Sequence, residues 1–230
     1  MRKTLWSALV IGILILTLTF ISYANGPGTT TASFSKIGVG ARATGMGGAF
    51  TAIANDGTTL YWNPAGLTQL KTKEISATYN SWFEEIRQGY LSLTFPSSRG
   101  TMGLGRNYVD MGKLEGRDVE GNPTGDFTAS DIHILIGYAR KLKKSSWGLT
   151  VGWLQDAIKE DKKNTFLANI GFLYPVSNRF TLGGAAQNMG IKLGSDPLPL
   201  IFKLGAASKS KNVTLAVDIA KPQGNEVYFS

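Results

Sequence analysis

His133 is the only histidine in the chain, and the sequence contains no cysteine. A catalytic serine or thiol depends on a neighbouring base, and zinc sites use His or Cys ligands. Ser130 and Asp131 stand close to His133 in the sequence, but proximity along a strand does not bring three side chains together. A lone histidine in a strand is more often structural. We therefore predict no catalytic residue, no metal site and no cofactor, and we expect that the protein is not an enzyme.

Glycine-rich loops can bind phosphate groups, and the chain has two closely spaced glycine pairs, Gly38 with Gly40 and Gly45 with Gly47. A dinucleotide-binding loop needs a third glycine at fixed spacing between a strand and a helix, and a phosphate loop needs Gly-Lys-Ser/Thr. The sequence has neither pattern. Close packing of the backbone in a confined space is the better interpretation, because glycine allows positive φ and close approach.

The overall mixture of residues narrows the class of protein. Charged residues make up 17% of the 230 residues, with a net charge of +8, whereas a typical soluble domain has about 25% charged residues. The 10% aromatic content excludes a disordered tail. Lysine clusters at 141–144, 159–163 and 209–211 are predicted to be solvated turns. Because these clusters would fall at both ends of a barrel, we expect no nucleic-acid partner.

The first 24 residues have the pattern of an export signal. Arg2 and Lys3 precede an apolar run over residues 8–21, and small residues at Ser22 and Ala24 occupy the positions that a signal peptidase recognises. The apolar run is shorter than the roughly 20 residues of a membrane-spanning helix. The sequence therefore predicts a cleaved signal peptide over residues 1–24.

After residue 73, large apolar residues recur at every second position, which is typical of strands with two different faces. A soluble sandwich would also alternate, but its free face would carry Lys and Glu rather than Gly, Ala, Thr and Asn. Strands of about nine to eleven residues with aromatics near their ends are typical of outer-membrane barrels. We predict an all-β fold, an antiparallel transmembrane β-barrel over residues 73–230. The residues expected to face lipid are Trp147, Val151, Phe172, Leu215 and Val217, and those expected to face inward are Gly148, Thr150, Gly152, Asn169, Thr181, Gln187, Thr214 and Asp218.

Short turns are expected to alternate with longer loops, which places the short turns on the periplasmic side of an up-and-down barrel. The long loops are expected at residues 110–128, 157–163 and 189–199. The last predicted strand stops at Ser230, so we expect a C-terminally truncated barrel, and a complete ten-stranded barrel with an unusual end is the alternative. Ten strands are predicted to start near residues 74, 87, 101, 129, 147, 164, 179, 200, 213 and 225.

Residues 34–67 fit neither the strand nor the long-helix pattern, and they contain a run of short motifs. The motifs read GARA at 40–43, GMGGAF at 45–50, AND at 54–56 and YWNPAGL at 61–67. Together they resemble the N-terminal signature of the PorV/PorQ family, which is similar to the FadL-like (OmpP1/FadL) superfamily of outer-membrane barrels that includes the long-chain fatty-acid transporters.

The resemblance implies a barrel of about fourteen strands, of which about ten are present. It also implies that residues 25–72 hold a glycine-rich hatch inside the barrel, on its periplasmic side. Pro64 fixes its own φ and the Asn63 side chain can bond the local backbone, so this pair can hold a turn in the hatch. A surface turn is the alternative. The hatch residues implied by the motifs are Gly45, Gly47, Gly48, Asn55, Asp56, Asn63, Pro64, Ala65 and Gly66.

Three functions are consistent with this reading, all in the bacterial outer membrane. PorV-like members imply a role in protein export and cell-surface attachment through a type IX secretion system, with cargo proteins or secretion components as partners. The wider superfamily implies a transporter of hydrophobic small molecules, and a purely structural envelope barrel is the third. Burial of an acyl chain needs an apolar lining, and the predicted inward residues are small and polar, so the sequence favours an export or envelope role. Outer-membrane lipid and lipopolysaccharide are expected surroundings, and the ligand-binding residues stay unknown.

Overall fold

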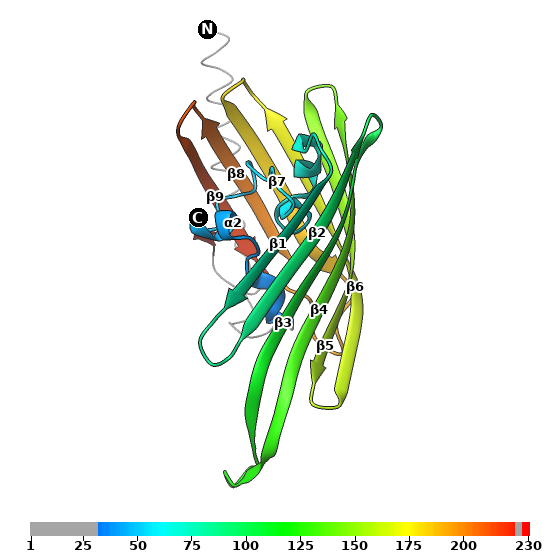
Figure 1. Ribbon diagram of the computed structural model, residues 1–230, viewed down its shortest axis with the longest axis vertical. Coiled ribbons are helices and arrows are strands. Elements are labelled where there is room, and N and C mark those ends of the chain that lie inside the picture. Colours follow the sequence, from blue (N-terminus) through cyan, green and yellow to red (C-terminus); the bar gives the residue numbers. More distant parts are fainter. Residues whose placement is uncertain (1–31, 224–226) are drawn as a thin grey trace.

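The computed structural model describes residues 32–223 and 227–230 and consists mainly of one antiparallel sheet of ten strands (Figure 1). Each strand pairs with the next along the chain, so the sheet order is the sequence order. The prediction of an all-β, antiparallel fold is confirmed, and among the described residues β1 and β10 do not pair. The predicted signal peptide lies outside the described residues. The strands are β1 (Glu74–Ser81), β2 (Arg87–Ser97), β3 (Gly100–Arg117), β4 (Pro123–Leu142), β5 (Ser145–Ile158), β6 (Asp161–Pro175), β7 (Phe180–Gly190), β8 (Ile201–Lys209), β9 (Thr214–Pro222) and β10 (Tyr228–Phe229).

The two faces of the sheet differ as the alternation predicts. The predicted outward residues Val151 and Leu215 have exposed fractions of 50% and 68%, whereas Thr150 and Asp218, on the other face, are buried. A β-strand points successive side chains to opposite faces, so a period of two in the sequence separates the residues in this way. Among the described residues, no helix is both long enough and apolar enough to span a membrane.

Two of the predicted long loops are wrong. Residues 110–128 continue the β3 and β4 ladder as a hairpin with its tip at residues 118–122, and this hairpin extends beyond the neighbouring strands (Figure 1). Residues 157–163 hold only a tight turn, because β5 ends at Ile158 and β6 begins at Asp161. Residues 117–126 and 158–164 are exposed on both faces, so they lack the alternation that marks a half-buried strand. The loop expected at 189–199 is present, between Gly190 and Ile201.

The strands are consequently longer than the predicted nine to eleven residues. β3 has 18 residues and β4 has 20, because their ladder continues into the hairpin. A register shift between Asp110 and Lys113 interrupts the pairing, and Gly112 between them has φ 68°. The strand starts agree more closely with expectation, since β1 and β2 begin at Glu74 and Arg87.

Residues 32–70, called the inner segment here, lie against one face of the sheet, which we call the inner face. This segment contains the short helices η1 (Ser33–Lys36), α2 (Ala41–Gly45), α3 (Thr59–Trp62) and η2 (Pro64–Gln69). Residues 50–67 approach β1 and β2 at Gly57, β3 and β4 at Leu60, β5 and β6 at Pro64, and β7 to β9 at Thr51. One short stretch can reach nine consecutive strands only because the sheet curls around it (Figure 1).

Candidate functional site

Asn63 fastens the inner segment to the sheet. It is fully buried, and its Nδ2 donates hydrogen bonds to the carbonyl oxygens of Thr51, at 2.7 Å, and Phe172 on β6, at 3.1 Å. Its Oδ1 accepts a hydrogen bond from the Ala65 amide at 3.1 Å. Asn63 has an extended backbone, as expected before a proline, and Pro64 starts η2. The side chain therefore joins three separate parts of the backbone.

The residues that follow Asn63 pack so closely that glycine is required beside them. A Cβ on Gly66 would overlap the Ala54 carbonyl oxygen, and a Cβ on Gly148 or Gly171 in the sheet would overlap the backbone or ring of Pro64. Asn63, Pro64, Ala65 and Gly66 are all buried, so this motif is not a surface turn. Glycine on the inner face is thus explained by the close approach of the inner segment.

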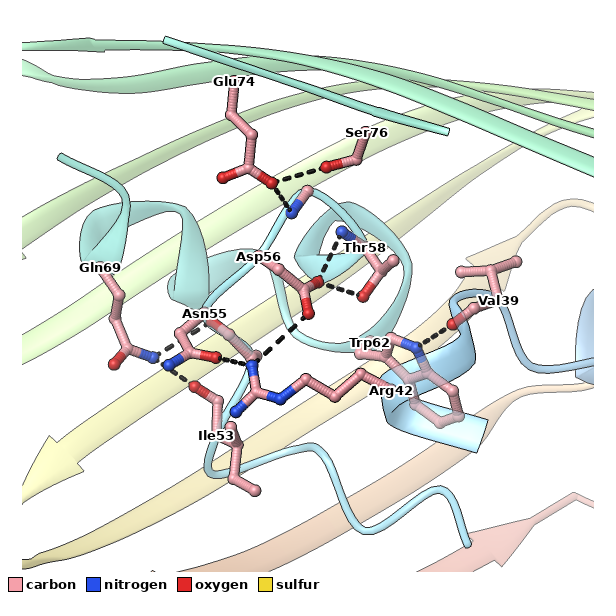
Figure 2. A network of polar contacts seen from close by, with 12 residues as sticks. Val39, Arg42, Ile53, Asn55, Asp56, Thr58, Trp62, Gln69, Glu74 and Ser76 are labelled. Carbon is pink, nitrogen blue, oxygen red and sulfur yellow. Dashed lines mark hydrogen bonds and ion pairs between the residues drawn. The ribbon is translucent and has the colours of Figure 1, made fainter. Parts of the chain in front are cut away.

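Asn55 and Asp56 belong to a polar network with Arg42 (Figure 2). The Arg42 guanidinium donates to Asn55 Oδ1 at 2.5 Å and lies 3.6 Å from Asp56 Oδ2. Asp56 Oδ1 accepts hydrogen bonds from the Thr58 amide and hydroxyl at 2.9 and 2.6 Å, which caps the turn before α3. This part of the network lies entirely within the inner segment.

A second part of the same network ties the inner segment to β1 (Figure 2). Glu74 Oε1 accepts hydrogen bonds from the Gly57 amide at 3.0 Å and from the Ser76 hydroxyl at 2.6 Å. Gln69 Nε2 donates to the carbonyl oxygens of Ile53 and Ala54. Gly57, which directly follows the motif at 54–56, therefore connects the inner segment to the first strand.

The predicted glycines of the 45–48 motif have a role in the backbone conformation. Gly47 and Gly48 have φ values of 66° and 86°, a region that favours glycine. Gly45 ends α2 and has open space around it. Gly48 lies beside the Trp62 ring. The structure divides the predicted residues into a chain reversal at 45–48 and an anchored stretch at 55–66.

Two charged residues of the sheet contact the inner segment. Asp218 Oδ2 on β9 accepts hydrogen bonds from the amides of Phe50 and Thr51 at 3.0 and 2.9 Å. Lys203 on β8 is buried, with its Nζ 4.4 Å from the centre of the Trp62 ring. Asp218 was predicted to face inward, but the sequence carries no signal for the role of Lys203, since a single lysine in a strand is usually solvated.

Tyr61 and Trp62 connect α3 to the beginning of the inner segment by hydrogen bonds. Its hydroxyl donates to the Ser35 carbonyl oxygen at 2.9 Å, and Trp62 Nε1 donates to the Val39 carbonyl oxygen at 2.8 Å. Burial raises the pKa of the Tyr61 hydroxyl above its ordinary value, and the nearby Tyr228 raises this pKa further. Tyr61 therefore remains a neutral hydrogen-bond donor throughout the physiological range.

His133 lies in a buried polar group on the inner face. Asn107 pairs directly with His133 across β3 and β4, and Gln88 donates to Asn107 at 3.2 Å. Ser130 and Asp131 point to opposite faces of β4 because they are consecutive in a strand. No cluster of three potential metal ligands occurs in the described part of the chain. We call Gln88, Asn107, Asp131 and His133 the inner polar cluster.

Several atoms of the inner polar cluster are buried without a hydrogen-bond partner within the described residues. They are Asn107 Nδ2, Asp131 Oδ1 and both ring nitrogens of His133. A buried polar atom without a partner is unfavourable by about 1–3 kcal/mol. The cluster therefore has free capacity both to donate and to accept hydrogen bonds.

The inner face also carries an apolar group that the sequence analysis did not anticipate. Val109 pairs with Asp131 across β3 and β4, and Leu154 pairs with His133 across β4 and β5, so this group adjoins the inner polar cluster. The expectation of a uniformly small and polar inner face is therefore incomplete. We call it the inner apolar cluster, and its buried members are Ala32, Phe34, Val109, Leu154, Leu167, Leu193 and Leu198.

Comparison with known proteins adds one match. A family model described as "Uncharacterised protein family (UPF0164)" matches residues 25–111. No curated protein matches the chain. The description of the family names no activity, and it mentions neither PorV/PorQ proteins nor fatty-acid transporters. The chain is thus similar to the UPF0164 family over the inner segment and the first strands.

Proposed function

We propose that this chain forms the wall and the hatch of a β-barrel in a bacterial outer membrane. The observation that carries the proposal is the outer face of the sheet, which presents large apolar side chains such as Trp147, Val151 and Val217 outward. A soluble sandwich would bury this face and expose the polar one. The inner segment would be the hatch, and the resemblance to PorV/PorQ and FadL-like proteins agrees with this arrangement.

An arginine placed on the outer face distinguishes a membrane from water. Val151 is 50% exposed in the middle of β5, and Val119 is 97% exposed at the tip of the β3–β4 hairpin. Val151→Arg should destabilise the barrel in lipid vesicles by about 2–4 kcal/mol, because the charge would enter the membrane. Val119→Arg, the matched control, should be neutral. Similar unfolding free energies for both variants would contradict the membrane placement.

We further propose that the barrel binds hydrophobic small molecules that carry a polar head. The inner apolar cluster is suited to an alkyl chain, since burial of each CH₂ contributes about 0.8 kcal/mol in apolar surroundings. The adjoining inner polar cluster has free donors and acceptors for a head group. Phe34 and its neighbours at the start of the inner segment fill the apolar cluster. A ligand would occupy this space when they withdraw.

Oleate binding to the detergent-solubilised chain tests this role. Leu154→Asn puts a polar group into the inner apolar cluster and should weaken binding about tenfold, whereas Phe34→Ala makes space and should strengthen it. Ile158→Asn is the control, because Ile158 has the size of a leucine but is exposed. This variant should leave binding unchanged. Opposite effects of the first two variants cannot arise from a shared loss of folding. Absence of oleate binding to the unaltered chain would reject the role.

A role in protein export or cell-surface attachment, of the PorV type, is the second candidate, and the β3–β4 hairpin supports it. The hairpin extends beyond the other strands (Figure 1), and in its tip Asp118 Oδ1 accepts a hydrogen bond from the Asn122 amide at 2.7 Å. The Asn122 side chain also holds the pKa of Asp118 below its ordinary value. Replacement of residues 118–122 by a two-residue turn should abolish cross-linking to exported proteins. Unchanged cross-linking would remove this candidate.

A further inference from the structure

The two ends of the sheet differ in charge. The short turns between β2 and β3, β4 and β5, β6 and β7, and β8 and β9 all lie at one end, together with residues 71–74 before β1 (Figure 1). Among the described residues at this end, Glu74 is the only acidic one, and its carboxylate accepts hydrogen bonds from Gly57 and Ser76. The opposite end carries both signs, with a majority of Asp and Glu. The basic residues of the short-turn end are Lys71, Lys73, Arg99, Arg140, Lys141, Lys143, Lys144, Arg179, Lys209 and Lys211.

Part of this basic end forms a groove. The groove has a volume of about 450 Å³ and lies between the end of the inner segment and the turns that follow β2 and β4. Its charged lining residues are Lys71, Arg99, Arg140 and Lys141, with no carboxylate among the lining residues. Hydroxyl groups of Thr68, Ser97, Ser98 and Thr101 complete the polar lining.

The cations of the groove are available for a ligand. All four are exposed, and none forms an ion pair with an acidic side chain in the described residues. Guanidinium groups bind phosphate oxygens through paired hydrogen bonds, and lysine adds a point charge. The lining of the groove thus provides four cations and several hydroxyl groups, and it contains no carboxylate that would repel an anion. This lining is suited to a phosphate group.

The surroundings of the groove indicate the source of the phosphate. Tyr138 bonds to Arg99 and Trp147 pairs with Arg140, so both aromatics lie next to lining residues of the groove. Both are exposed, as are the apolar side chains of Phe95 and Leu142 near the same end. The polar atoms of the two aromatics point to the turns: the Tyr138 hydroxyl donates to the Arg99 carbonyl oxygen at 2.7 Å, and Trp147 Nε1 donates to the Ser145 hydroxyl at 3.1 Å. Aromatics with one apolar and one hydrated end are typical of a membrane interface.

We infer that this groove binds the phosphate head group of an anionic phospholipid. The inference depends on the membrane placement proposed above, and it goes further by assigning the lipid to the short-turn end. The acyl chains would lie along the apolar outer face beside Phe95 and Leu142, while Arg99, Arg140 and Lys141 contact the phosphate. An acidic protein would match the charges but not the neighbouring aromatic and apolar side chains.

Lipid binding to the full chain in neutral detergent tests the inference. Native mass spectrometry should detect phosphatidylglycerol retained at least tenfold better than phosphatidylcholine. The triple variant Arg99→Gln/Arg140→Gln/Lys141→Gln should lower the affinity for phosphatidylglycerol about tenfold or more, because each cation near an anionic head group contributes. The control Lys113→Gln/Lys162→Gln/Lys163→Gln, at the opposite end, should retain the lipid as the unaltered chain does. Added salt should weaken binding.

Three results would overturn the inference. One is equal retention of the two lipids, and another is an equal loss in the control variant. The third is full competition by inorganic phosphate at concentrations close to that of the lipid, which would indicate a site for free phosphate. Membrane placement is measured separately, by whether the chain leaves the membrane fraction only on addition of detergent. A chain that is found in the membrane but has no preference for phosphatidylglycerol would contradict the groove alone.

Discussion

The ammonium group of Lys203 lies 4.4 Å from the centre of the Trp62 ring, so a cation of the sheet rests on an aromatic ring of the inner segment. Lys203 also interacts electrostatically with Asp218, whose carboxylate accepts hydrogen bonds from two backbone amides of the inner segment. β8 and β9 thus hold the inner segment through charged side chains, β5 and β6 hold it through close packing at glycine, and Asn63 adds a hydrogen bond to β6.

Removal of the Lys203 charge should loosen this contact. Lys203→Met keeps the length of the side chain but loses the cation–π interaction, and we expect a loss of about 0.5–2 kcal/mol in the free energy of unfolding. Cleavage by trypsin at Arg42 in the inner segment should become faster. Lys209→Met, at an exposed position of the same strand, is the control. An equal effect of the two variants would show that the contact does not stabilise the fold.

Replacement of Asn63 should be among the most destabilising changes in the chain. Asn63→Ala leaves the Ala65 amide and the carbonyl oxygens of Thr51 and Phe172 without their partner, and each unpaired group costs about 1–3 kcal/mol. Asn63→Asp keeps the acceptor but places a carboxylate against two carbonyl oxygens, so it should be no milder. Asn178→Ala, in an exposed turn, should change the unfolding free energy little. Urea titration of the chain in detergent measures all three.

Two glycines of the motifs should respond oppositely to alanine. A Cβ on Gly66 would overlap the Ala54 carbonyl oxygen, so Gly66→Ala should prevent the native packing of η2 or destabilise it by about 1–3 kcal/mol. Gly45 ends α2 with open space around it, and Gly45→Ala should be neutral or stabilise by up to about 1 kcal/mol. A larger loss at Gly45 than at Gly66 would contradict the packing described here.

The stability should fall at alkaline pH through Tyr61. Its folded-state pKa is raised above the ordinary 10.0, so its contribution is complete below that pH and is lost as the pH rises toward the folded pKa. Unfolding free energies measured from about pH 8 to about pH 11 should therefore decline at the upper end. Tyr61→Phe should reduce this decline, although it loses the hydrogen bond to Ser35, worth about 1 kcal/mol. An unchanged pH dependence would assign the decline to other groups.

Local patterns in the sequence determined a large part of the structure. The alternation at Thr150 and Val151 separates the faces of the sheet correctly, because in a strand the direction of a side chain depends only on its position. Nine of the ten strands start within three residues of their expected positions, and β4 starts six residues earlier than expected. The motifs around Asn63 marked the segment that the structure places on the inner face. The loops at 110–128 and 157–163 were misjudged, since an exposed hairpin has no buried face to produce a pattern.

Tertiary structure alone decided which distant residues meet. Asp218 accepts a hydrogen bond from the Phe50 amide, although the two residues are 168 positions apart in the sequence. A local pattern of residues cannot predict such a contact. The junction of Val109 and Leu154 with Asp131 and His133 depends on the register of β3, β4 and β5, which a sequence pattern constrains only by face. The basic groove depends on the same long-range geometry: an antiparallel order brings Arg99 and Arg140 to one end of the sheet, beside Lys71. The alternation in the sequence determines on which face of the sheet each side chain lies, whereas the curl and the register of the sheet determine which residues surround it.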